Sequence, residues 1–281
     1  MKEKIFKLAF TAFSLTFFFG LTGFTNGPKG DKDKEKQTAS KVTNNAFKHG
    51  EMLEYRVHYG AVTAGTARME VKESPVTVNG KTCYHMVGQG ISSKSFSLFY
   101  RVNDRYETFV DRETLIPMKF KRKIEEGTFK HYTEVEFDHE KHKAYEKRST
   151  VQHTTTYDVP PYIQDVMSAF YFARTQDYAN AKPGDVTEFQ NFIDKKVHDL
   201  KVEFLGREVI QIGNIKYRTV KLKPLVKEGG IFQHEGDLYL WISDDENRIP
   251  IRVESGLVIG SIQVDLKKAK NLRHPMTARV R

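Results

Sequence analysis

Four histidines within one stretch of the sequence carry side chains that could bind a metal ion. They are His131, His139, His142 and His153. His139 and His142 stand three residues apart, which would place two imidazoles on one face of a helix. The segment FDHEKHK is charged, however, and lies between two strand-like runs, which is typical of a hairpin turn. We therefore expect neither a metal site nor another cofactor here.

Pairs of aspartates could provide general acid–base chemistry, as in a hydrolase acting on a polysaccharide or lipid. The candidates are Asp104, Asp111, Asp237 and Asp244, and each of the first two recurs 133 residues later. This repetition favours turn formation, because an Asp side chain accepts hydrogen bonds from nearby backbone amides. The sequence has no Gly-x-Ser-x-Gly motif and no glycine-rich phosphate loop, so we identify no catalytic residue.

Three lysines alternate with other residues along one predicted strand. Lys119, Lys121 and Lys123 would share a face of that strand, and the next strand carries Glu134 and Glu136 with the same alternation. This pattern predicts ion pairs across the two strands. A basic stripe that binds a ligand is the alternative interpretation.

Arg174 falls on the apolar side of a predicted helix. It follows Ile163 by eleven residues, which corresponds to about 20° around a helix. A buried arginine needs a partner. Arg174 therefore either extends to water at the helix end or binds an inner carboxylate or the acidic group of a ligand. Our candidate ligand-binding residues are Arg174, Phe170, Trp241, Tyr239 and Tyr106.

The helix that carries Arg174 is predicted over residues 161–180. Pro160 and Pro161 favour a helix start, and the sequence Lys-Pro-Gly at 182–184 ends it. Its apolar residues follow the i, i+3, i+4, i+7, i+8 pattern. We expect four of them to pack on the concave face of a curved sheet, near Trp241 and Tyr239 or their counterparts in the first half of the chain. These four are Ile163, Val166, Met167 and Phe170.

Most of the remaining sequence reads as short strands separated by Gly, Pro and Asp turns. Residues 80–127 match residues 213–260 at 12 of 48 positions without a gap. The matches include turn glycines, turn acids and the Ile-Pro pairs at Pro117 and Pro250. We predict a mainly β fold in which two related antiparallel meanders, about 50–140 and 184–268, form a curved sheet, half-barrel or sandwich with one central α-helix.

The N-terminal residues are predicted to direct export. Three lysines precede an apolar run from Leu8 to Phe19, which is typical of a signal peptide over residues 1–27. Residues 28–45 are charged and predict a flexible linker, and 271–281 a C-terminal tail. The β domain then occupies 46–270. Cys83, the only cysteine, lies in a strand-like run and is expected in the core, so neither a disulfide nor a lipid-anchored cysteine is expected.

Several of these segments together resemble a known family. GEMLEYRVHYGAVTAGTARMEV, YHMVGQGISSKSFSLFYRVNDRYETFVD and GDLYLWISDDENRIPIRVES are similar to domain-of-unknown-function family 3108, a family of exported bacterial envelope proteins. The resemblance covers most of the chain from Phe47 to Leu266 and implies no established activity. LWISDDENRIPIRVE also resembles a strand-turn-strand of lipoprotein-carrier half-barrels, which implies a curved sheet around an apolar cavity.

Together these observations predict a periplasmic protein that binds an apolar or amphipathic ligand, or an envelope partner, without catalysis. An envelope hydrolase and a purely structural scaffold are the alternatives. The net charge of +9 suits lipid or an envelope polymer as partner, and contact with a membrane surface. Nucleic acid is not expected as a partner in that compartment.

Overall fold

The computed structural model describes residues 41–225, 238–256 and 261–280. The helices are α2 (Lys94–Ser97) and α3 (Val166–Ala173). The strands are β1 (Met52–Tyr59), β2 (Val62–Val71), β3 (Val76–Val78), β4 (Lys81–Ser92), β5 (Asn103–Asp111), β6 (Pro117–Glu126), β7 (Phe129–Asp138), β8 (Lys143–Arg148), β9 (Val151–Asp158), β10 (Val186–Ile193), β11 (Lys196–Ile212), β12 (Ile215–Pro224), β13 (Leu238–Ser243), β14 (Pro250–Gly256), β15 (Ser261–Lys270) and β16 (Arg279–Val280).

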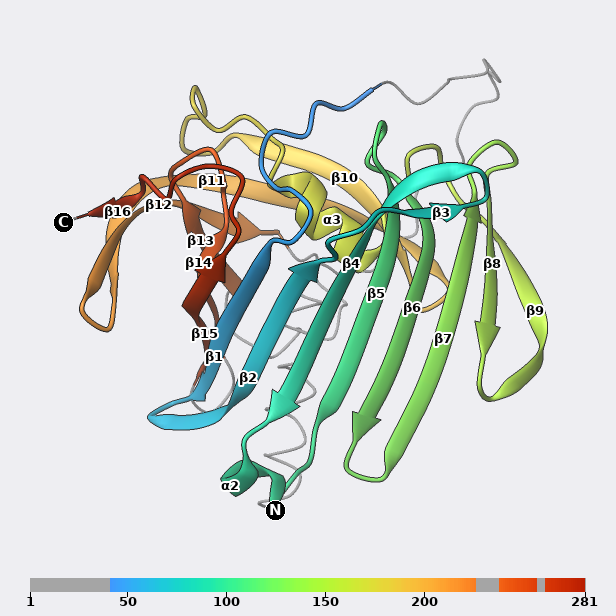
Figure 1. Cartoon of the computed structure of the whole chain (residues 1–281), viewed down its shortest axis with the longest axis horizontal. Coiled ribbons are helices and arrows are strands. Elements are labelled where there is room, and N and C mark those ends of the chain that lie inside the picture. The colour runs from blue at the N-terminus through green and yellow to red at the C-terminus, as the bar shows by residue number, and fades with distance from the viewer. Residues whose placement is uncertain (1–40, 226–237, 257–260, 281) are drawn as a thin grey trace.

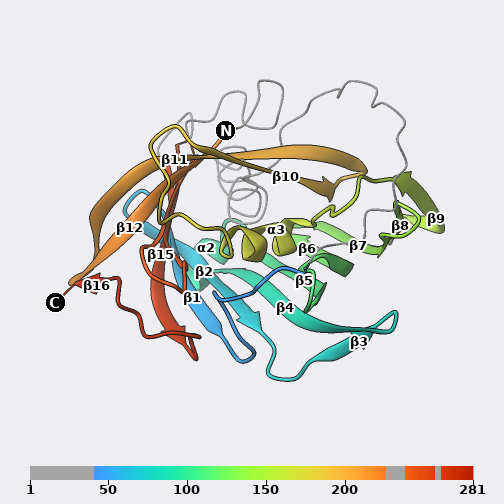
Figure 2. The ribbon, with the colours of Figure 1, turned by 90° about the horizontal axis from the view of Figure 1, so that it is seen from above.

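These strands form one antiparallel sheet that curls around α3 (Figures 1 and 2). The hydrogen-bonded order is β10-β11-β12-β13-β14-β15-β1-β2-β4-β5-β6-β7-β8-β9, with β3 beside β4 and β16 beside β12. The prediction of a mainly β fold with a curved antiparallel sheet is thus confirmed, and the sheet is not closed into a barrel.

Side chains, rather than a backbone ladder, join the two ends of the sheet. Phe192 of β10 packs against Phe137 of β7 and Tyr157 of β9, with ring centroids 6.3 and 5.3 Å apart. Arg122 of β6 reaches Asp194, in the β10–β11 turn, at 2.6 Å. The β10–β11 hairpin therefore lies over the concave face, as Figure 2 shows.

The two predicted units pass through their strands in the same order. The first unit runs β1-β2-β4-β5-β6-β7, and the second runs β10-β11-β12-β13-β14-β15. In the first unit two strands, β2 and β3, pair with β4, and in the second the single long strand β11 pairs with β12 in the same place. Backbone positions with positive φ also recur. They are Gly50 and Gly184, Gly60 and Asp194, Gly80 and Gly213, and Leu115 and Arg248. This agreement is expected if the two units arose by duplication. The duplication itself stays a prediction.

Pro117 and Pro250 each begin a strand, β6 and β14, as predicted for a residue that cannot donate to the ladder. Each is paired next to a register shift, Pro117 with Val110 and Pro250 with Ile242. The separation is seven residues in the first pair (117 − 110) and eight in the second (250 − 242). The second turn is therefore one residue longer. As a result, each residue of β13 lies on the opposite face of the sheet from the residue of β5 to which the ungapped alignment matches it.

This extra residue decides which of the two predicted places the helix occupies. Tyr106 of β5 is buried in the core, whereas its predicted counterpart Tyr239 lies on the outer face of β13 with Trp241. Lys221 covers both outer rings, with its Nζ 4.9 Å from each centroid. Helix α3 packs against β10 and against β5, the strand that carries the first-half counterparts Tyr106 and Thr108. This confirms the first-half alternative of the prediction.

The helix is also shorter than the predicted span of 161–180. Tyr162 has a φ of 59°, and Gln164 forms a parallel bridge to Asn191, so the backbone before Asp165 is not helical. Asp165 caps α3, because its Oδ1 accepts hydrogen bonds from the backbone amides of Met167 and Ser168 at 2.7 and 2.8 Å. Three of the four predicted core residues are buried, and Phe170 is partly buried. The three are Ile163, Val166 and Met167.

Both ends of the described chain belong to the fold, which corrects the predicted boundaries. Val42, placed in the predicted linker, donates its backbone amide to the Glu113 carbonyl at 2.9 Å, and Phe47 is fully buried. β16, placed in the predicted tail, pairs with β12, and Ala278 before it is buried. The predicted signal peptide lies outside the described residues. Among those described, no helix is long and apolar enough to span a membrane.

The packing of α3 leads to a stability prediction. Met167 is completely buried, so Met167→Ala should lower the free energy of unfolding by about 2–5 kcal/mol. Val209→Ala is the matched control, because that side chain is 57 % exposed and should change stability by less than about 0.5 kcal/mol. Urea unfolding measures both. Equal losses in the two variants would show that α3 is not part of the core.

Candidate ligand-binding site

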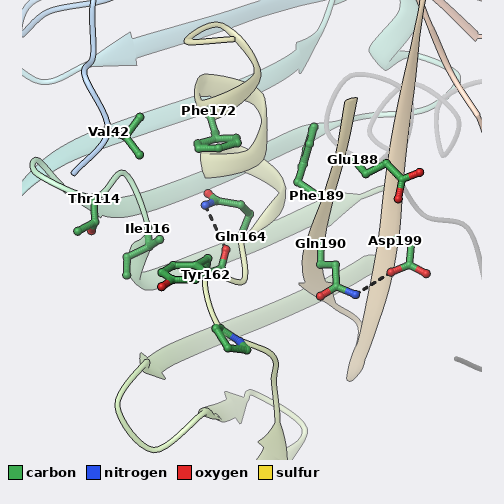
Figure 3. Close-up of a pocket in the computed structure, with 11 residues that line it drawn as sticks. Val42, Thr114, Ile116, Tyr162, Gln164, Phe172, Glu188, Phe189, Gln190 and Asp199 are labelled. Carbon is green, nitrogen blue, oxygen red and sulfur yellow. Dashed lines mark hydrogen bonds between the residues drawn. The ribbon is translucent and has the colours of Figure 1, made fainter. Parts of the chain in front are cut away.

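A pocket of about 470 Å³ lies where the connection into α3 meets the β10–β11 hairpin (Figure 3). Its walls come from the N-terminal segment before β1, the β5–β6 turn, the 161–164 connection, α3 and the hairpin. The lining residues are Val42, Thr114, Ile116, Pro161, Tyr162, Gln164, Phe172, Glu188, Phe189, Gln190 and Asp199. The pocket therefore joins segments that are far apart in sequence.

One side of the pocket is aromatic and apolar. Phe172 of α3 and Phe189 of β10 stand edge to face with ring centroids 6.0 Å apart. Figure 3 shows the two rings above Gln164 and Tyr162. Both phenylalanines are partly exposed, and Val42 and Ile116 line the pocket as well. This wall offers apolar surface to a ligand of modest size.

The other side of the pocket is acidic. Glu188 of β10 and Asp199 of β11 stand at its rim, and both are exposed. Glu188 forms an ion pair with Lys201, and Asp199 accepts a hydrogen bond from the Gln190 amide at 2.7 Å. The charge of Glu188 is thus balanced by a neighbouring cation. The rim favours a cationic group over an anionic one.

Two buried amides at the pocket, one lining it and one next to it, have unsatisfied hydrogen-bonding atoms. Gln164 Oε1 and both amide atoms of Asn191 are buried and have no hydrogen-bond partner among the described residues. The two residues face each other across the parallel bridge between the 161–164 connection and β10. An unsatisfied buried polar group costs about 1–3 kcal/mol. Three such atoms therefore lie next to the pocket, on side chains of two facing segments.

The predicted ligand-binding residues are not brought together in this pocket. Tyr106 is in the core, Phe170 lies at its edge, and Trp241 and Tyr239 lie on the outer face. Sequence reasoning missed Phe172, Phe189 and Glu188. No local signal joins them, because the alternation along EFQNF at 188–192 would place Glu188 and Phe189 on opposite faces of one strand.

Arg174 binds an inner carboxylate, one of its two predicted alternatives. Its guanidinium donates to both carboxylate oxygens of Glu51, at 2.6 and 2.9 Å, and to the carbonyls of Asn247 and Ala46. It also lies 5.6 Å from the ring centroid of Phe47. Burial alone would lower the pKa of Arg174, but the charge and hydrogen bonds of Glu51 raise it above the ordinary value. Arg174 is therefore a charged structural residue with its bonding groups occupied.

The lysine stripe forms cross-strand ion pairs, as predicted. Lys119 lies 2.9 Å from both Glu134 and Glu136, and Lys121 lies 3.6 Å from Glu134. Lys123 pairs instead with Glu125 of its own strand. These contacts hold β6 to β7 and leave little free positive charge for a ligand.

The predicted turn aspartates behave differently from one another. Asp111 accepts hydrogen bonds from the Glu113 amide and the Thr114 hydroxyl, as a turn residue does. Asp104 lies within β5 and accepts the backbone amide of Glu125 at 3.0 Å, so its predicted turn role is wrong. Asp244 pairs with the Arg207 side chain, while the neighbouring Asp245 binds the turn amide. Asp237 lies outside the described residues.

Cys83 and the histidines take structural positions in the part of the chain that is described. Burial, and then the nearby charge of Asp111, raise the pKa of the Cys83 thiol to about 11, so it stays protonated at neutral pH. The ring of His139 contacts the Pro117 carbonyl at 2.7 Å. No cluster of three metal-ligating side chains is found among the described residues.

Comparison with known proteins supports this fold. The family model described as "Protein of unknown function (DUF3108)" matches residues 54–267. A crystal structure of a beta-barrel-like protein of DUF1849 from Brucella abortus superposes with a TM-score of 0.52 at 11 % identity, covering 80 % of this chain and 99 % of that one. This likeness shows the fold alone. No curated protein matches the chain.

Two further structures are less similar. An exported protein with a YmcC-like fold from Bacteroides fragilis, as its description has it, gives a TM-score of 0.31. A protein from Parabacteroides distasonis, described as a lipoprotein, gives 0.32. In both comparisons the identity is 11 %, with coverage of 83 % of this chain and 100 % of the other.

The buried cap of α3 gives a pH prediction. Asp165 is fully buried and accepts a hydrogen bond from the Thr108 hydroxyl at 2.5 Å. Burial raises the pKa of Asp165 from 3.8 to about 6, although its hydrogen bonds oppose the shift. The folded state therefore binds more protons than the unfolded state between about pH 4 and 6, so this group makes the protein more stable as the pH falls through that window.

Asp165→Asn tests this sign. Asparagine is an equally good cap and carries no charge, so the variant should lack this contribution. The stability of wild type relative to the variant should rise by roughly 2 kcal/mol between pH 7 and pH 4. Urea unfolding of both proteins across that range measures the difference. A difference that is constant with pH, or that falls on acidification, would contradict the assignment.

Proposed function

The chain belongs to the DUF3108 family, and from that premise and the pocket beside α3 we propose that it binds a small amphipathic molecule without chemically changing it. The observation that carries this proposal is the contrast within one pocket. An edge-to-face pair of phenylalanines faces an exposed acidic rim. A ligand with an apolar part and a cationic group satisfies both sides.

The size of the pocket limits the ligand. A volume of about 470 Å³ falls within the range of small-molecule sites, which is about 300–1,000 Å³. The apolar part would lie against Phe172 and Phe189, and an amine would lie near Glu188 and Asp199. Such a ligand gains apolar burial on one side and charge attraction on the other.

We place this binding in the periplasm. The support is the predicted signal peptide over residues 1–27. A protein of the envelope meets amphipathic molecules routinely, including lipids and their fragments. Binding without catalysis agrees with a pocket whose carboxylates are both held at the rim, one by Lys201 and one by Gln190.

Octylamine and octanoate test the proposal, because they share an apolar chain and differ in the sign of their charge. Calorimetry at low salt, below micelle formation, should give octylamine at least about fivefold tighter binding. Replacing both rim carboxylates (Glu188→Gln with Asp199→Asn) should remove most of that preference. Phe172→Ala should weaken both ligands by about tenfold or more, since it removes apolar contact.

Tyr239→Ala is the control, because it removes an aromatic ring from the outer face and should leave both affinities unchanged. Equal binding of the amine and the carboxylate would contradict the role of the acidic rim. Binding that survives Phe172→Ala unchanged would show that the ligand occupies another place.

A further inference from the structure

Large apolar side chains are exposed together at one end of the sheet. Leu98 is 84 % exposed and Phe99 is 67 % exposed, both in the loop between α2 and β5. Val62, at the start of β2, is 56 % exposed, and Phe129, at the start of β7, is 54 % exposed. Single exposed apolar residues are ordinary, but a group of them marks an interaction surface.

Hydrogen bonds tie the three loops that carry these side chains. The Ser93 amide donates to the Ala64 carbonyl at 2.8 Å, and the Gly127 amide donates to the Arg101 carbonyl at 2.8 Å. The loop after β4 is thereby fixed to the β1–β2 hairpin on one side and to the β6–β7 turn on the other. Figure 1 shows α2 and both hairpins at the same end of the sheet. We call residues 61–63, 93–101 and 127–130 the apolar tip.

The α2 segment of the apolar tip is anchored from within. Phe96 is buried at 4 % exposure, and Ser93 caps α2 by accepting the Phe96 amide at 3.2 Å. With Phe96 directed inward, Leu98 and Phe99 extend outward immediately after it. The exposed side chains of Leu98 and Phe99 therefore project from a loop that is anchored to the core.

Basic side chains surround the apolar tip. Lys94, Arg101 and Lys130 are exposed and form no ion pair within the described part of the chain. Glu125 lies opposite Lys130 across β6 and β7, but it forms its ion pair with Lys123 at 2.9 Å, and Glu126 is buried. Apolar side chains surrounded by basic ones are typical of a surface that inserts into the headgroup region of an anionic bilayer.

We propose that the apolar tip inserts into the surface of a lipid bilayer that carries anionic headgroups. Leu98 and Phe99 enter the boundary between headgroups and acyl chains, and Lys94, Arg101 and Lys130 stay at the phosphate level. Charge complementarity selects this occupant. A protein partner would need an interface of about 1,000 Å² or more, which four protruding side chains do not offer.

A fluorescence experiment tests the apolar tip directly. Trp241 is the only tryptophan, so Leu98→Trp in a Trp241→Phe background places the only indole at the tip. The purified protein is mixed with vesicles of phosphatidylglycerol and phosphatidylcholine in equal parts, some with brominated acyl chains. The emission should shift to the blue and be quenched by the bromine. The matched control is Val209→Trp in the same background, an exposed position on β11 away from the tip, which should show neither change.

The charge contribution is tested with the same indole. Combining Leu98→Trp with Lys94→Glu and Arg101→Glu should weaken vesicle binding by about tenfold or more, and added salt should weaken binding of the parent. Vesicles of phosphatidylcholine alone should bind less. An indole at position 98 that keeps a water-like, unquenched emission would overturn the proposal. Equal quenching at position 209, or equal binding to neutral vesicles, would overturn it as well.

Discussion

The ion pair between Arg174 and Glu51 connects the end of α3 to the start of β1 and to the β13–β14 turn. The side chains are 2 % and 1 % exposed, and two hydrogen bonds link them. The same guanidinium holds the carbonyl of Asn247 in the β13–β14 turn and that of Ala46 in the segment before β1. Asn247 in turn holds the C-terminal residues through the backbone of His274. One cation therefore fixes the end of α3, both ends of the described chain and the second half of the sheet.

This arrangement helps to position two of the residues that line the pocket. Val42 and Phe172 line it. Val42 lies four residues before Ala46, whose carbonyl Arg174 holds, and Phe172 lies two residues before Arg174 itself. Along β5, the pocket and the apolar tip lie at opposite ends, because the turn after Asp111 forms part of the pocket and the loop before Asn103 forms part of the tip. Nine residues of strand separate them by about 30 Å. A protein that contacts a bilayer with its tip would thus hold its pocket away from the surface.

Local patterns were enough to predict the strands and the Ile-Pro strand starts, and they gave an inner carboxylate as one of the alternatives for Arg174. Turn chemistry and alternation are properties of short segments, so the sequence displays them directly. The identity of that carboxylate was beyond such reasoning, because Glu51 lies 123 residues away and only the tertiary fold brings it close.

The errors also have specific physical causes. Because the second turn has one extra residue before Pro250, Tyr239 and Trp241 lie on the outer face of the sheet. The alignment of Tyr239 with the buried Tyr106 had predicted the inner face. The helix lost its first turn because the bridge between Gln164 and Asn191 keeps the connection extended. The pocket was missed because its walls come from five segments, and no single segment carries a motif. Phe172 and Phe189 become a pair only when β10 folds over the concave face.

A double-mutant cycle on Glu51 and Arg174 tests the central claim most directly. Urea unfolding would compare wild type with Glu51→Gln, Arg174→Met and the combined variant. Each single change leaves a buried charge without its partner and should cost about 3–5 kcal/mol, and the combined change should cost clearly less than the sum. Losses below about 1 kcal/mol in both single variants, or losses that simply add, would contradict a structure that depends on this pair.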